Sequence, residues 1–118
     1  MAGYRDLKVW QLAMGLAETV YKSSADFPRH ELYGLASQLQ RAAISIPSNI
    51  AEGQARSSHK EFRHFLAIAL GSLAELETQI ILAQRLGYLT DKDTEPILQQ
   101  SEEIAKMLKG LQKSLTSN

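Results

Sequence analysis

Apolar residues recur at every third or fourth position through most of the chain, which is the period of an amphipathic α-helix. The first stretch of this kind follows Asp6, a residue type that often caps helices, and it stops before Asp26 and Pro28. Three further stretches repeat the pattern. We therefore predict helices at about residues 7–23, 31–55, 59–86 and 91–115.

The second stretch begins near Glu31 and carries Pro47 in its interior. An interior proline removes one backbone hydrogen bond and crowds the preceding turn. Because the apolar period continues on both sides of Pro47, we expect a kink there within one helix rather than two separate helices.

The last two stretches have clear boundaries. Ser58 and Glu61 have the spacing of a capping box, which starts the third helix, and Gly87 is suited to the left-handed conformation that ends it. Thr90 or Thr94 can cap the fourth helix. The connections between the four helices are short, so successive helices are antiparallel neighbours. The predicted fold is an all-α, antiparallel up-down-up-down four-helix bundle, formed as a single domain by residues 1–118.

Composition narrows the function classes. The 118 residues suffice for one core without metal or disulfide staples, and the absence of cysteine excludes a thiolate metal site and a cysteine nucleophile. No signal-peptide pattern and no continuous apolar run of about 20 residues is present, so we expect a cytoplasmic protein that does not enter a membrane. Thirteen basic residues balance thirteen acidic ones, so total charge does not favour nucleic acid.

The third helix has more apolar residues than one bundle-facing stripe uses. Leu66, Leu70, Ile81 and Leu82 lie outside its main seam. Either the stripe is wide, or these residues form a subunit interface in a homo-oligomer.

The sequence contains few residues in patterns that indicate a catalytic or metal site. Glu61 and His64 have the Glu-x-x-His spacing of di-iron bundles, but those sites need two such motifs, and Glu61 already has a capping role. The histidines lie near helix ends and have no recognisable catalytic partner. We predict a protein that is not an enzyme and has no catalytic residues, cofactor or metal site.

Polar side chains also follow the helical period on the second and third helices. If the two polar stripes face each other, Arg41 pairs with Glu75 or Glu77 in a partly buried network that fixes helix register. Otherwise the stripes form a solvated face or line the channel of an oligomer. The candidate network comprises Gln38, Arg41, Ser45, Glu75 and Glu77.

Antiparallel topology gathers cationic side chains at one end of the bundle, opposed by Asp6, Glu52 and Glu61. This end contains the start of the first helix, the turn between the second and third, and the end of the fourth. Basic residues near a helix C-terminus also favour its dipole, which is the plain structural explanation. The candidate contacts for nucleic acid or a partner are Arg5, Lys8, Arg56, His59, Lys60, Arg63, Lys109 and Lys113.

Four segments resemble one family: YRDLKVWQ at residues 4–11, YGLASQL at 33–39, SIPSNIAEG at 45–53 and GSLAELET at 71–78. They are similar to the 23S rRNA intervening-sequence proteins, four-helix bundles named after reading frames inside insertions in some bacterial 23S rRNA genes. The resemblance implies no enzymatic activity and implies a five-fold homo-oligomer. A related accessory protein of diversity-generating retroelements binds nucleic acid and a reverse transcriptase through a strongly basic surface. The present chain departs from it, with a net charge of zero and a pI of about 6.8.

We therefore expect a non-enzymatic homo-oligomer, a pentamer by the resemblance, that engages RNA, DNA or a nucleic-acid-handling protein through its basic end. The alternative is a protein–protein interaction adaptor that binds no nucleic acid.

Overall fold

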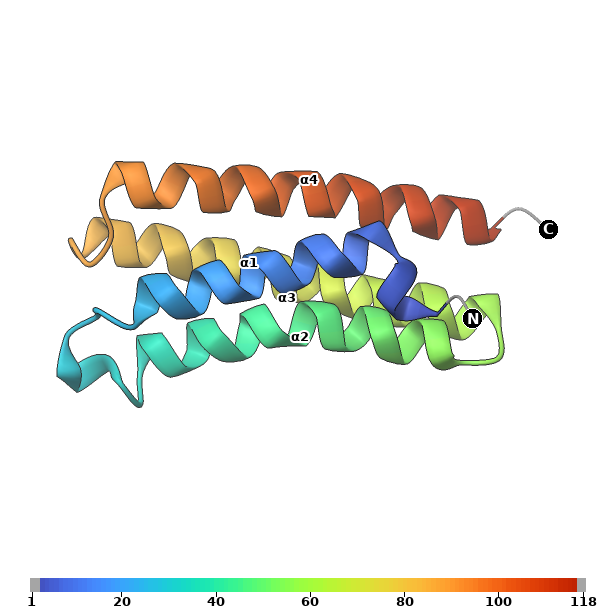
Figure 1. The fold of residues 1–118 in the computed structure, drawn as a ribbon, viewed down its shortest axis with the longest axis horizontal. Coiled ribbons are helices and arrows are strands. Elements are labelled where there is room, and N and C mark those ends of the chain that lie inside the picture. The colour runs from blue at the N-terminus through green and yellow to red at the C-terminus, as the bar shows by residue number, and fades with distance from the viewer. Residues whose placement is uncertain (1–2, 117–118) are drawn as a thin grey trace.

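The computed structural model describes residues 3–116 and has four long helices arranged side by side (Figure 1). They are α1 (Lys8–Ser24), α2 (Leu35–Ala55), α3 (His59–Arg85) and α4 (Asp91–Thr116), with short 3-10 helices η1 (Tyr4–Asp6) and η2 (Arg29–Glu31). The principal extents are 48 × 22 × 22 Å. Each helix packs against its two neighbours in the order α1, α2, α3, α4, so α1 and α3 lie diagonally opposite. The predicted antiparallel four-helix bundle is confirmed.

Two predicted helix starts need correction. Asp6 does not cap α1, because it belongs to η1 and Leu7 takes the N-cap position. The second helix starts at Leu35 rather than near Glu31. The carboxylate of Glu31 instead accepts a hydrogen bond from the Leu35 amide at 3.0 Å, which satisfies one of the free N–H groups at the start of α2. The other predicted boundaries agree to within about one residue.

Specific contacts define where α3 and α4 begin, and a glycine conformation defines where α3 ends. The Glu61 amide donates to the Ser58 hydroxyl at 3.1 Å, which confirms that Ser58 caps α3. Thr90 is the cap of α4: its hydroxyl accepts from the Asp93 amide at 3.1 Å, and the Asp93 carboxylate accepts from the Thr90 amide at 3.3 Å. Gly87 has a φ of 82°, the left-handed conformation expected after α3.

The second helix runs without interruption through Pro47, which is buried, so the prediction of one helix is confirmed. The kink at Pro47 stays a prediction. Near its end, α2 approaches α3 closely at Gly53, where an added Cβ would lie 2.7 Å from the Cβ of Phe65. Only a glycine allows this approach without displacement of a neighbour.

The core consists of fully buried aliphatic side chains from all four helices, including Leu16, Leu39, Ile46, Leu76 and Ile104.

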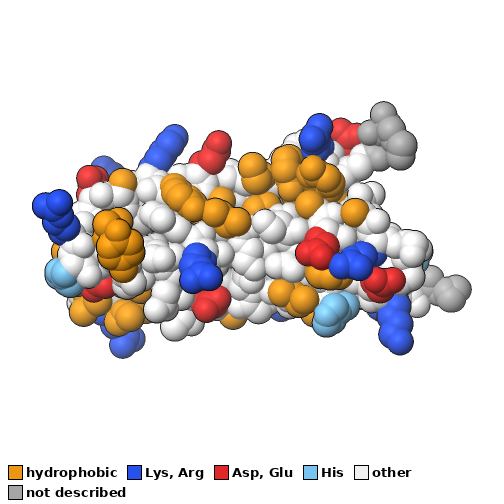
Figure 2. Space-filling model, turned by 90° about the horizontal axis from the view of Figure 1, so that it is seen from below, with side chains coloured by type: hydrophobic (Ala, Val, Ile, Leu, Met, Phe, Trp, Pro, Cys, Tyr) orange, Lys and Arg blue, Asp and Glu red, His pale blue; other side chains and the backbone are white. Residues whose placement is uncertain are grey.

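The predicted apolar surplus on α3 is only partly correct. Leu66 is fully buried in the core, because the inward stripe of α3 is wider than one seam, and Leu70 is half-buried. Ile81 and Leu82 are exposed at 37% and 46%. Figure 2, seen from the α2 side, shows that hydrophobic side chains also gather in the upper half of the view, which is the α1 side, with charged groups scattered between them. Exposed apolar surface is therefore a real feature of this subunit.

Candidate nucleic-acid interface

The predicted basic end exists as an arrangement of elements. The start of α1, the α2–α3 turn and the end of α4 all lie at the same end of the bundle (Figure 1). All eight candidate cations are in the described range; Arg63 is half-buried and the others are exposed. Their surroundings differ, and they divide into a turn side and an α4 side.

On the turn side, acidic groups offset the charge of Arg56. Its guanidinium lies 2.8 Å from a carboxylate oxygen of Glu52 and 3.7 Å from one of Glu61, and it stands over the ring of Phe65 at 4.9 Å from the centroid. A guanidinium held by two carboxylates and an aromatic face has little attraction left for a phosphate.

Arg63 has a structural role. It donates a hydrogen bond to the backbone carbonyl of Leu115 at 2.8 Å, and the Gln112 side chain donates to the Arg63 carbonyl at 3.3 Å. These two contacts join the start of α3 to the last turns of α4, where carbonyl groups lack intrahelical partners.

Three candidates remain on the turn side or in η1. The guanidinium of Arg5 lies 5.7 Å from the centroid of the Tyr4 ring, and η1 packs on α1 and α2. His59 and Lys60 are exposed at the start of α3, the end of a helix dipole that repels cations.

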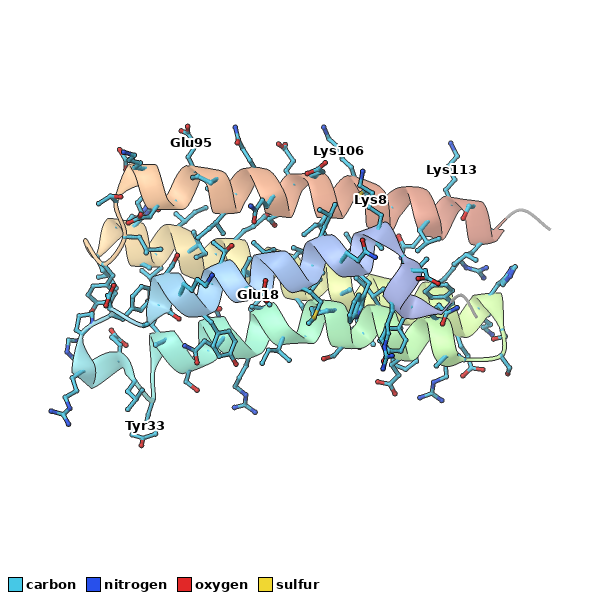
Figure 3. The ribbon with its side chains drawn as sticks, viewed as in Figure 1. Lys8, Glu18, Tyr33, Glu95, Lys106 and Lys113 are labelled. Atoms are coloured by element: carbon cyan, nitrogen blue, oxygen red, sulfur yellow. The ribbon has the colours of Figure 1, made fainter. Side chains whose placement is uncertain are left out.

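On the α4 side, four lysines are exposed and form no ion pair with any residue in the described range 3–116. We call them the lysine face: Lys8, Lys106, Lys109 and Lys113. Figure 3 shows Lys106 and Lys113 pointing away from the same side of α4, with Lys8 between them at the start of α1. At about 1.5 Å per residue, the three α4 lysines extend over roughly 10 Å.

Lys106 was not among the sequence-based candidates. It lies in the interior of α4, whereas the sequence-based candidates come from helix ends and turns. The spacing of residues 106, 109 and 113, by three and then four, was the available sign that these lysines share one helical face.

The polar stripes of α2 and α3 meet, but not through Arg41. The hydroxyls of Ser45 and Ser72 are 2.8 Å apart across the two helices, and the Asn49 amide donates to the Ser45 carbonyl at 2.7 Å. The Ser45–Ser72 contact fixes the register of α2 against α3, whereas the Asn49 contact lies within α2.

The predicted ion pair of Arg41 is corrected. Within the described part of the chain Arg41 forms no ion pair; it lines an exposed groove with Gln38 and Glu75. Glu77 faces α4 instead, where its carboxylate accepts a hydrogen bond from Ser101 at 2.6 Å. In an exposed groove an ion pair would gain little over hydration of the two charges.

The opposite end has a polar cluster that sequence analysis missed. The Tyr88 hydroxyl donates to the Glu31 carboxylate at 2.9 Å and lies 3.3 Å from the His30 ring nitrogen. The Leu35 amide, and then the Tyr88 hydroxyl, hold the pKa of Glu31 below its ordinary range. The same carboxylate raises the pKa of Tyr88. The cluster joins the α1–α2 and α3–α4 connections.

The isolated Glu-x-x-His motif does not build a metal site. The Glu61 carboxylate accepts from the Ser58 hydroxyl at 3.3 Å and faces Arg56, and no group of three His, Asp or Glu residues within positions 3–116 is placed to hold a metal ion.

These features define the class of protein: an all-α four-helix bundle with a group of exposed lysines on its α4 side. The family model for 23S rRNA-intervening sequence proteins matches residues 5–110. The chain belongs to this family, which confirms the resemblance seen in the sequence.

A solved structure supports the assignment. A crystal structure of a protein of unknown function from the S23 ribosomal protein family of Bacteroides thetaiotaomicron has 29% sequence identity and a TM-score of 0.80, covering 89% of this chain and 98% of its own. No curated protein matches the chain.

Proposed function

We propose that this protein is a non-enzymatic, homo-oligomeric helical scaffold that binds nucleic acid, alone or with a nucleic-acid-handling protein, through the lysine face. The observation that supports this function is the set of four exposed lysines with no ion-pair partner among residues 3–116. We also propose a cytoplasmic location and, from the family resemblance, a five-fold assembly.

Unpaired lysines favour the phosphate backbone over the bases. Binding a phosphate with a lysine releases condensed counterions, so affinity falls as salt rises, by a slope of about −0.9 per phosphate contact on duplex DNA. Four lysines in one subunit set an upper slope of about −3.6. The exposed tyrosines, Tyr21 and Tyr33, lie on α1 near the opposite end and in the α1–α2 connection, so they offer no stacking surface beside the lysines. The expected binding is sequence-independent.

Fluorescence anisotropy with a labelled RNA duplex and a DNA duplex, between 50 and 200 mM salt, tests the proposal. We expect binding that weakens with salt, and a loss of affinity of about tenfold or more in Lys106→Glu/Lys113→Glu. The matched control is Arg29→Glu/Lys92→Glu, which makes the same charge change at the opposite end. Equal weakening by both double variants, or no salt-dependent binding in the wild type, contradicts the proposal.

A second candidate is a protein–protein adaptor without nucleic-acid binding. The apolar groove between α1 and α2, with Met14, Tyr21 and Ile44 exposed, favours this function. The anisotropy experiment separates the two, because an adaptor of this kind leaves the labelled duplexes unbound at low salt.

A further inference from the structure

An apolar groove of about 590 Å³ lies between α1 and α2. We call it the α1/α2 groove. Trp10, Met14, Tyr21 and Ile44 contribute apolar surface to it, and the charged residues Glu18 and Lys22 also line it. Met14, Tyr21 and Ile44 are exposed by 39%, 42% and 45%. Groups of this size, exposed together in one groove, indicate a surface that another molecule covers.

A second apolar surface is the outer face of α3. Ile68, Ile81 and Leu82 are exposed there by 39%, 37% and 46%. The most apolar 18-residue window of this helix has a mean hydropathy of 1.6, yet only 39% of it is buried within the subunit. By length and composition alone α3 would suffice to cross a membrane, a test that core helices of soluble proteins also pass. The outer face of α3 therefore also needs a covering partner.

The two surfaces lie on different sides of the bundle, because α3 is diagonal to α1. A contact between two different surfaces of identical chains is a head-to-tail contact, which closes into a ring when the rotation between subunits permits. Each chain then covers both of its apolar surfaces with copies of itself.

Two hydrogen bonds define which residues lie at the same level along the bundle. The Gln40 amide donates to the Ser24 hydroxyl at 2.9 Å, which places these residues level on α2 and α1. The Ser45 and Ser72 hydroxyls are 2.8 Å apart, which places them level on α2 and α3. Ser45 lies five residues after Gln40 on α2. Because α1 is antiparallel to α2, Ser45 is level with the α1 residue five positions before Ser24, which is Thr19. Thr19 on α1 and Ser72 on α3 are therefore at the same level.

Counting from this level, a positive charge on one surface and a negative charge on the other lie at the same height along the bundle axis. Lys22 lies three residues after Thr19 and Glu75 three residues after Ser72, on helices that run in the same direction. Both side chains are exposed, and neither forms an ion pair within the described subunit. When neighbouring bundles stand side by side without a shift along the axis, Lys22 of one chain meets Glu75 of the next.

The side-chain sizes are complementary at the same levels. Met14 in the groove is level with Ala67 on α3, and Tyr21 is level with Ala74. Both alanines are exposed. Large groups thus stand opposite small ones, as packed helical interfaces require.

We propose that the α1/α2 groove of one chain receives the outer face of α3 from a second copy, head to tail and with parallel bundle axes, so that Lys22 pairs with Glu75 of the neighbour. This inference rests on the proposed self-association and adds the two surfaces that carry it. The lysine face lies on the α4 side and stays outside this contact.

Cysteine cross-linking tests the pairing directly, because the chain has no cysteine of its own. Lys22→Cys and Glu75→Cys are prepared as separate proteins, mixed, and treated with a short bismaleimide. We expect a covalent dimer in the mixture and little in either protein alone. A mixture of Lys22→Cys with Lys113→Cys, an exposed position on the lysine face and outside the proposed contact, is the matched control and stays monomeric on a denaturing gel.

The double variant Lys22→Cys/Glu75→Cys sharpens the result. Because α1 and α3 are diagonal within one subunit, cross-links in this variant join different chains. A head-to-tail ring gives a ladder of covalent species that stops at the number of subunits in the ring.

Charge exchange provides a test that does not depend on the reagent. Lys22→Glu lowers the average mass measured by light scattering at a fixed micromolar concentration, and Lys22→Glu/Glu75→Lys restores it.

The outcomes distinguish two failures. A monomeric mass for the wild type contradicts self-association itself. An oligomeric mass with no cross-link between Lys22→Cys and Glu75→Cys overturns only the proposed pairing of surfaces. Efficient cross-linking of Lys22→Cys with itself also overturns it, because it indicates a two-fold contact between identical surfaces.

Discussion

The two sides of the basic end differ in what surrounds their cations. On the turn side, Arg56 is held by Glu52 and Glu61, and Arg63 is hydrogen-bonded to the last turns of α4. On the α4 side, the lysine face has no ion-pair partner in the described chain. Arg56 and Arg63 on the turn side thus make contacts within the subunit, while the lysines on the α4 side are available to another molecule. Charge count alone does not reveal this difference.

The largest expected effect concerns packing, which is tight on the turn side and open on the α4 side. In Gly53→Ala the new Cβ would lie 2.7 Å from the Cβ of Phe65 and 3.0 Å from the ring of Phe62, so α2 and α3 must separate. We expect a loss of about 1–3 kcal/mol in the free energy of unfolding, measured by urea denaturation.

Gly110→Ala is the matched control on α4, where nothing lies within 4 Å of an added Cβ. Removal of a helical glycine there stabilises by about 0.5–1 kcal/mol. Equal effects of the two substitutions would contradict the difference in packing.

The next effect concerns the hydrogen bond from Arg63 to the Leu115 carbonyl. Arg63→Ala removes it and lowers the free energy of unfolding by about 1 kcal/mol. Hydrogen exchange in the last turn of α4 accelerates at the same time. Lys60→Ala, an exposed neighbour, changes stability by less than about 0.5 kcal/mol. An unchanged exchange rate in Arg63→Ala would show that the contact does not hold the end of α4.

The opposite end provides a pH-dependent comparison. The lowered pKa of Glu31 means that its carboxylate stabilises the fold above the pKa of the unfolded chain, and that this contribution disappears as the pH falls through the folded-state pKa. Wild type is therefore more stable than Glu31→Gln at pH 7, and the difference shrinks below about pH 4. Thermal denaturation from pH 3 to 7 measures this. A difference that does not change with pH would assign the role of Glu31 to shape rather than charge.

The fold was predictable because four long apolar repeats, a capping serine and a left-handed glycine agree with one another. The start of α2 could not be predicted in the same way. The Glu31 carboxylate accepts from the Leu35 amide from a position outside the helix, and this contact leaves no mark in the apolar repeat. Periodicity places a residue on a helix face but does not say which neighbour it meets. For this reason the Ser45–Ser72 contact agrees with the predicted facing stripes, while Arg41 stays unpaired and Glu77 meets Ser101 on α4.

The sequence predicted the correct end of the bundle for the candidate interface, but it did not predict which cations at that end have partners in space. Whether a lysine or arginine is free depends on its neighbours in space. The glutamates beside Arg56 are close in sequence, but the carbonyl that holds Arg63 comes from the far end of the chain. Lys106 can be recognised as part of the lysine face only from the spacing of lysines along the whole helical face of α4.

The central claim is that the lysine face binds phosphates and that Arg56, on the turn side, does not. The most direct measurement is the salt dependence of binding to a labelled RNA duplex for two neutral variants, Lys113→Gln and Arg56→Gln. The account predicts that Lys113→Gln reduces the magnitude of the salt slope by about 1, while Arg56→Gln leaves the slope unchanged. A slope reduced equally by Arg56→Gln, or reduced by Arg56→Gln alone, would contradict it.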